Sequence, residues 1–165
     1  MLKAEIELKE LRHDVAWFNE RVVIGKSWIE IYQHEALEAS LIKTDGQWFF
    51  IVRERMNENG KCKALPKNQV VDFESYVSLF QECLAWPLDY IIIEVVKDAC
   101  RMRIRSGVLG TAPVYFRAQD DTVKLSWEFA DFLHLHFAID NEIVAHRLAL
   151  ATFYTARTIC AGIFL

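Results

Sequence analysis

His134 and His136 are the residues in this sequence whose spacing most resembles a metal-binding pair. Residues two apart in a strand share a face, so both imidazoles could reach one ion. The nearby carboxylates, Asp131 and Asp140, do not complete a recognisable ligand set. We therefore interpret the two histidines as ordinary surface or packed residues, and we expect no metal-ligating residue in the chain.

Cys83 is the residue best suited to be a nucleophile, if a histidine lay beside it to deprotonate its thiol. It sits next to Leu84 on the apolar stripe of a predicted helix, which favours an inert core thiol. None of the cysteines forms a CxxC pair, so we expect free thiols, with Cys83 and Cys160 in apolar surroundings. The remaining cysteines are Cys62 and Cys100.

His146 and Glu142 are four residues apart in a predicted helix. At this spacing their side chains lie on one face, where an acidic and a basic group stabilise the helix. We interpret this pair as electrostatic support and not as an acid–base pair.

The composition indicates a folded domain that does not bind nucleic acid. Apolar residues make up 53% of the 165 residues and charged residues 25%, enough for one packed core. The net charge of −4 argues against a nucleic-acid partner, which normally needs a concentrated basic face. Arg101, Arg103 and Arg105 alternate with apolar residues, so they predict the solvent face of a strand.

No segment of the sequence has the features of a membrane span or a secretory signal. No apolar run approaches the roughly 20 residues that a spanning helix needs. The first five residues, Met-Leu-Lys-Ala-Glu, contain no apolar signal region. We expect a cytoplasmic protein.

The first half of the chain predicts antiparallel strands. Residues 28–32 alternate as a strand does, and Asp45-Gly46 predicts a tight turn joining strands at 38–43 and 47–53. The apolar run Trp-Phe-Phe-Ile-Val in the second of these is typical of a strand buried on both faces. Residues 57–69 are polar and predict an exposed loop.

One helix is predicted after that loop, with Asp72 as its N-cap and Trp86-Pro87 ending it. Its apolar stripe is predicted from residues at helical spacing. They are Phe73, Tyr76, Val77, Phe80 and Leu84.

The second half predicts strands again, then short helices. The strands are expected at 88–96, 100–105, 113–117 and 123–127, with turns at Lys97-Asp98 and Asp120-Asp121. Residues 128–133 predict a helical turn, and Asp140 predicts the cap of a last helix over 142–152. The last five residues are apolar, and we interpret this end as cut from a longer protein.

This order of strands, helix, strands and helix predicts an α+β fold of a single domain over residues 1–165. Two arrangements fit the pattern equally: two sheets sandwiched between helices, or another α+β packing.

Residues 106–116 resemble a segment near the end of the glutaminase domain of asparagine synthases, Arg-Asp-x-x-Gly-x-x-Pro-Leu-Tyr-Tyr. Gly110, Pro113 and Tyr115 match it. Residues 124–133 resemble the strand and helix that follow it in the family, and residues 158–163 resemble the run into the synthetase domain. These three matches occur in the family's order. Residues 1–85 resemble the family in strand order only.

The resemblance implies an N-terminal-nucleophile hydrolase fold, with two antiparallel sheets between helical layers. The family hydrolyses glutamine with an N-terminal cysteine, but Leu2 stands at that position here. Residues 53–58 do not reproduce the family's Asn-Gly-Glu, and Ser106-Gly107 replaces its Arg-Asp. The first twenty residues do not resemble the family's first strand. We expect no catalytic residue and no cofactor-binding residue.

Similar losses mark β-lactam synthetases and lasso-peptide cyclases, in which this domain is a scaffold for an ATP-using domain. The six glycines are too scattered for a pyrophosphate loop, so ATP and Mg²⁺ are expected only in a separate synthetase domain. We expect that domain as the partner, with a homodimer also possible. Two alternatives stay open: a stand-alone peptide- or protein-binding module, and residual amidohydrolase activity using a non-terminal cysteine.

Overall fold

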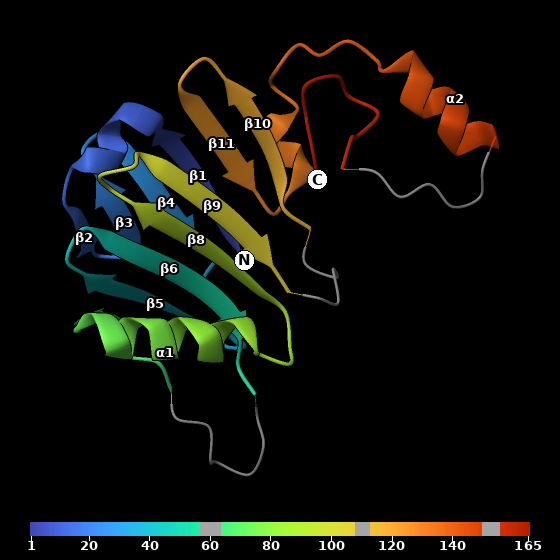
Figure 1. Ribbon diagram of the computed structural model, residues 1–165. Helices are drawn as coiled ribbons and strands as arrows, with labels where there is room; N and C mark the ends of the chain where they lie inside the picture. The colour runs from blue at the N-terminus through green and yellow to red at the C-terminus, as the bar shows by residue number, and fades with distance from the viewer. Residues whose placement is uncertain (57–63, 108–112, 150–155) are drawn as a thin grey trace.

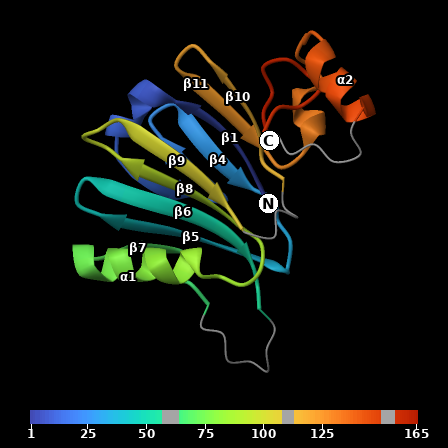
Figure 2. The same ribbon diagram turned by 45° about the vertical axis from the view of Figure 1, so that its right-hand side comes forward.

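The computed structural model describes residues 1–56, 64–107, 113–149 and 156–165. These residues form two β-sheets that pack face to face, with helix α1 on the outside of one of them (Figures 1 and 2). The described elements are β1 (Leu2–Glu7), η1 (Leu8–Arg12), β2 (Val15–Phe18), β3 (Arg21–Ile24), β4 (Ser27–Ile31), β5 (Leu37–Thr44), β6 (Gln47–Glu54), β7 (Asn68–Val70), α1 (Phe73–Leu84), β8 (Tyr90–Val96), β9 (Arg101–Ser106), β10 (Tyr115–Gln119), β11 (Thr122–Ser126), η2 (Phe129–Phe132) and α2 (Asn141–Ala149).

The first sheet has six antiparallel strands in the order β10-β11-β1-β4-β3-β2. β1 is central because its residues alternate strictly, with Leu2, Ala4 and Ile6 buried against the second sheet. β1 and β2 lie within the first twenty residues, where no strand was predicted; that these residues differ from the family's first strand stays a prediction. The alternation is short and uses a small alanine, which makes the strand easy to overlook.

The outer face of this sheet carries charged side chains in ion pairs across neighbouring strands. Glu30 pairs with Lys3 and with Arg21, and Glu5 pairs with Lys124. The short helix η2 covers this face only at the end near Ser126, and α2 lies beyond the β10 edge (Figures 1 and 2). In the described part of the chain, helix α1 is thus the single helical layer, whereas the resemblance implies a layer on each side.

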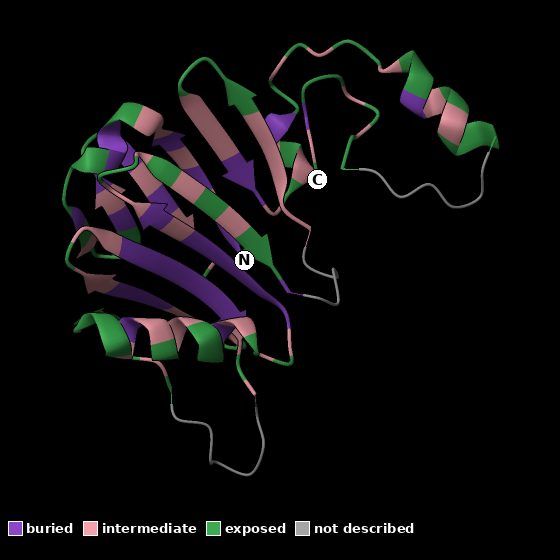
Figure 3. Cartoon of the chain, in the orientation of Figure 1, coloured by how far each residue is buried: buried purple, intermediate pink, exposed green. Residues whose placement is uncertain are grey.

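The second sheet has five strands in the order β7-β5-β6-β8-β9, all antiparallel except the β5–β7 pair. The predicted hairpin at Asp45-Gly46 is confirmed, with Gly46 at φ 71° in the turn. β6 is buried on both faces, as Figure 3 shows. Trp48, Phe50 and Val52 face the first sheet, and Phe49 and Ile51 face α1.

Helix α1 follows its sequence signals at both ends. The Asp72 carboxylate accepts a hydrogen bond of 2.9 Å from the Ser75 amide, which caps the first turn. Tyr76 and Phe80 pack against Phe49 with ring centroids 5.2 Å away. Phe73, predicted in the same stripe, is 62% exposed because it precedes the part of the helix that lies over the sheet.

The predicted strands and turns of the second half are confirmed as β8 to β11, and the helical turn as η2. α2 is capped by Asp140, whose carboxylate accepts from the Ile143 amide; the predicted extension over 150–152 lies outside the described residues. The predicted loop at 57–69 was partly wrong, because residues 68–70 form β7 beside β5. Its first part, 57–63, lies outside the described residues.

Two substitutions test the packing of α1 on β6. Tyr76 is buried and its hydroxyl lacks a hydrogen-bond partner. We expect Tyr76→Phe to leave the free energy of unfolding unchanged or raise it by about 1 kcal/mol, because it removes an unsatisfied polar group. Phe49→Ala should lower it by about 3–5 kcal/mol through loss of a large core ring. Urea denaturation measures both, and a clear destabilisation by Tyr76→Phe would contradict this account.

Candidate functional site

One end of the sandwich holds three of the six buried polar or charged residues in the described part of the chain: Arg53, Asp89 and Ser126. β1, β5 and β8 begin there, and β4, β6, β9 and β11 finish there; we call it the Met1 end. Met1 itself is buried, and its carbonyl accepts a hydrogen bond of 3.0 Å from the Tyr32 amide. Burial lowers the pKa of the Met1 amine to about 5, although the negative charge of Glu128 acts in the opposite direction.

The residues at the start of β1 offer no nucleophile. Met1 and Leu2 are 2% and 0% exposed, and neither side chain has a hydroxyl or a thiol. In N-terminal-nucleophile chemistry the attacking side chain and the amine that activates it belong to one residue. The position that the resemblance identifies as reactive is therefore filled by apolar packing.

Arg53 is the most buried cation at the Met1 end, with 1% of its surface exposed. Its Nε donates a 2.6 Å hydrogen bond to Glu38 Oε1 across the β5–β6 pair. The guanidinium carbon lies 3.6 Å from the centroid of the Trp86 ring. The indole N–H of Trp86 donates to the Glu54 carbonyl, which fixes the ring in this position. Arg53 Nη1 is buried without a hydrogen-bond partner.

Asp89 is a second buried charged residue, just before β8. Its Oδ1 has no hydrogen-bond partner. A Cβ atom at Gly107 would lie 3.2 Å from this oxygen and 3.2 Å from the Tyr90 amide nitrogen, so glycine leaves the room that Asp89 occupies. Arg53 pairs with Tyr90 on the α1 face, and strand alternation places Asp89 on the other face.

Ser126 carries a buried hydroxyl, but its hydrogen bonds are structural. It donates to Asp131 Oδ2 at 2.5 Å and accepts from the Glu128 amide at 3.0 Å. The Tyr32 hydroxyl donates to the same Asp131 oxygen. These bonds hold η2 on the outer face of the first sheet, so the serine is engaged at both its donor and its acceptor positions.

The other residues considered as metal ligands or acid–base groups do not form a common site in the described part of the chain. His134 and His136 are exposed and lie in and after a turn, not on a strand, so the geometry proposed for a shared ion is not formed. Within the described ranges no group of three or more His, Cys, Asp or Glu residues is arranged to hold a metal ion. His146 lies in α2 as predicted.

None of the helices in the described part of the chain is long and apolar enough to cross a membrane.

The three cysteines that the structure describes are free thiols, while Cys62 lies outside the described residues. Cys83 is fully buried, as predicted, and burial raises the pKa of its thiol to about 12. Cys160 is only partly buried, so the prediction of apolar packing holds for Cys83 alone. Cys100 accepts a 2.9 Å hydrogen bond from Arg12 Nε at the end opposite Met1.

Several family positions cannot be compared. Gly110, at the centre of the matched turn, and Asn57 and Glu58 lie outside the described residues. The contacts of Arg53, Asp89 and Ser126 were not predicted from the sequence. The burial of Arg53 could have been predicted, because Arg53 continues the every-second-residue pattern by which Phe49 and Ile51 face α1.

Comparison with known proteins adds no relative: no protein-family model, curated protein or solved structure matches this chain.

The Glu38–Arg53 pair gives a test of its role in folding. Glu38→Leu should lower the free energy of unfolding by about 3–5 kcal/mol, because it leaves a buried guanidinium without its carboxylate. Combining it with Arg53→Met should recover most of that loss, because an apolar pair replaces the ion pair. A double-mutant cycle in urea measures the coupling; additive single effects would contradict a specific pair.

The Cys83 thiol should resist alkylation in the folded protein, since the thiolate is the reactive form. Because its pKa is raised from 9 to about 12 on folding, the unfolded chain ionises first and the free energy of unfolding falls between these pH values. Peptide mapping after iodoacetamide treatment at pH 8 should show Cys100 modified and Cys83 unmodified until urea is added. Cys83→Ala should reduce the alkaline loss of stability, and fast native-state labelling of Cys83 would refute this assignment.

Proposed function

We propose that this chain is the non-catalytic N-terminal scaffold domain of an asparagine-synthase-like, ATP-dependent amide-forming enzyme. In that enzyme a separate synthetase domain adenylates a carboxylate, and an amine then attacks to form the amide. We also assign the fold to the N-terminal-nucleophile hydrolase type, with a degenerate glutaminase pocket. The proposal shares this degeneracy with β-lactam synthetases and lasso-peptide cyclases.

The observation that carries the proposal is the position and composition of β1. A central strand begins at the Met1 end, which is the arrangement expected if a reactive N-terminal residue were presented there. The residues present are Met1 and Leu2, both buried and both without a nucleophile. A glutaminase-type domain that has lost its nucleophile would keep β1 in the centre of the sheet and begin it with apolar residues, as this chain does.

The ordered resemblance of three segments supports the same assignment. The described parts of those segments include β10, β11 and η2, and β10 lies between β11 and the C-terminal stretch. Phe116 in β10 exchanges two backbone hydrogen bonds of 2.9 Å with Phe164. The C-terminal stretch thus extends the edge of the first sheet next to the matched turn.

ATP chemistry is assigned to the other domain because this chain has no suitable phosphate-binding sequence. Its six glycines are at positions 25, 46, 60, 107, 110 and 162, none within a compact glycine-rich loop before a helix. ATP and Mg²⁺ would therefore be held by the synthetase domain. A cytoplasmic location is part of the proposal, because that is where such an enzyme finds ATP.

Exposed apolar residues in the C-terminal third provide a surface for the synthetase domain. Ile139 is 67% exposed and forms a β-bridge with Cys160, in the segment that resembles the family's run into the synthetase; Leu148 in α2 is 85% exposed. Large apolar side chains grouped on a surface are typical of an interface. Three further apolar residues in the described part of the C-terminal third are exposed: Leu133, Ile159 and Leu165.

Co-purification tests the proposal. The chain should be expressed with the synthetase-like protein encoded after codon 165 or by a neighbouring gene, and the two should elute as one complex. Leu148→Asp with Ile139→Asp should weaken the complex by at least about tenfold, because a charge cannot be buried unpaired at an interface. Phe18→Asp is the matched control, since Phe18 is 69% exposed on β2, away from α2 (Figure 1).

Two results would overturn the proposal. One is the lack of any synthetase-like coding sequence after or beside this gene. The other is a complex that the control weakens as much as the double variant does, which would place the partner elsewhere or make the association non-specific.

A further inference from the structure

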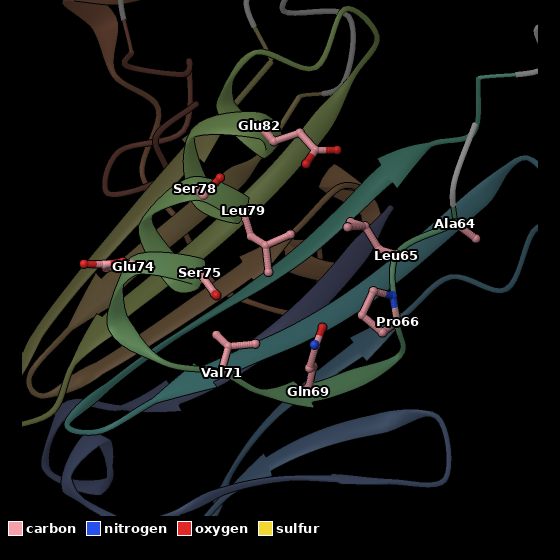
Figure 4. Close-up of a pocket in the computed structure, with 10 residues that line it drawn as sticks. All are labelled: Ala64, Leu65, Pro66, Gln69, Val71, Glu74, Ser75, Ser78, Leu79 and Glu82. Atoms are coloured by element: carbon pink, nitrogen blue, oxygen red, sulfur yellow. The ribbon is translucent and has the colours of Figure 1, made fainter. Parts of the chain in front are cut away.

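A groove runs along helix α1 where the second sheet ends at β7. It has a volume of about 760 Å³ and lies between the helix and residues 64–71. Leu65, Val71 and Leu79 point into it from both sides and form an apolar floor (Figure 4). The same three side chains pack against the α1 core cluster, so the floor is held in place.

The strand beside the groove has one edge whose backbone groups make no hydrogen bond with the residues that the structure describes. β7 pairs with β5 in parallel, with the Lys67 carbonyl accepting from Leu41 and the Val71 amide donating to Lys43. Backbone groups of a strand alternate in direction, so the N–H and C=O groups of Asn68 and Val70 point away from β5. β7 is the last strand of this sheet, and its three residues are exposed.

The groove is acidic at one end. The Glu82 carboxylate extends over it, whereas the Glu74 carboxylate points away (Figure 4). Among the described residues that line the groove there is no lysine or arginine. Glu82 has no ion pair with any residue in the described part of the chain. A ligand with a positive charge near Glu82 and apolar groups along the floor would therefore be complementary.

We propose that this groove binds an extended peptide segment carrying a basic residue, which adds a strand to the free edge of β7. The peptide backbone pairs with Asn68 and Val70, as in other complexes formed by strand addition. Its alternate side chains cover Leu65 and Leu79, and its basic residue faces Glu82. The helix stretch from Ser75 to Glu82 is about 10 Å long, which matches about three extended residues.

A peptide fits this edge better than a second copy of the chain does. Pairing two β7 strands around a two-fold axis would bring two acidic α1 rims next to each other. Like charges in that arrangement repel and would oppose the contact. The site is also independent of the synthetase proposal, because it lies on the α1 side of the second sheet and not on the C-terminal third.

Titration calorimetry with designed peptides tests the inference. The probe is an acetylated, amidated hexapeptide, Val-Thr-Val-Thr-Lys-Thr, whose two valines and lysine share one face of a strand, and its twin carries Glu in place of Lys. We expect the lysine probe to bind the wild-type chain about tenfold more tightly than its twin. Glu82→Lys should reverse this preference, and Glu74→Lys, whose carboxylate points away from the groove, should change either affinity less than about twofold.

Backbone pairing needs its own test. Val70→Pro removes an N–H that points away from β5, so it should abolish binding and leave the β5–β7 ladder intact. Hydrogen exchange on the wild-type chain gives an independent readout: the Asn68 and Val70 amides should become protected when the lysine probe is added.

The inference is overturned if the lysine probe fails to bind at about 1 mM. It is also overturned if Glu82→Lys and Glu74→Lys have equal effects, or if the Asn68 and Val70 amides exchange at unchanged rates in the bound state. Concentration-dependent self-association that protects the same amides would identify a second copy of the chain as the occupant and reject a peptide.

Discussion

The burial of β6 on both faces is the constraint on which the rest of the structure depends. Trp48, Phe50 and Val52 require a second sheet on one side, while Phe49 and Ile51 require a helix on the other. A strand with no polar face cannot lie at a surface, so α1 and the six-stranded sheet must both be in place before β6 is stable. The order of the three layers, first sheet, second sheet and α1, therefore follows from residues 48–52 of β6.

The position of Arg53 follows from the same strand. The alternation that buries Phe49 and Ile51 carries a guanidinium under the end of α1, where it would be costly without compensation. Glu38 neutralises it and the Trp86 ring covers it, yet Nη1 remains unsatisfied. At the same end of the molecule, β1 presents Met1 and Leu2 in a buried position. The described residues of the Met1 end thus include buried charged groups and a buried chain start without a nucleophilic side chain.

Local patterns were sufficient for most of the fold. The hairpin at Gly46, the cap at Asp72 and the strands of the second half are set by turn chemistry and alternation over a few residues. β7 was not predictable in this way, because a three-residue strand with exposed side chains is recognised only by its pairing with β5. The helical layer over the first sheet was expected from a family resemblance, and cross-strand ion pairs such as Lys3–Glu30 occupy that face instead. The contact of Asp89 with Gly107 joins segments distant in sequence, so no local pattern indicates it.

The central claim is that this domain supports amide formation without supplying ammonia from glutamine. The most direct measurement is the rate of amide formation by the synthetase partner, with this chain present, as the glutamine concentration is varied. A scaffold predicts a rate that requires the chain but does not change with glutamine. A rate that rises with glutamine and saturates, while free ammonia gives the same product, would show that the domain is a working glutaminase and would contradict the account.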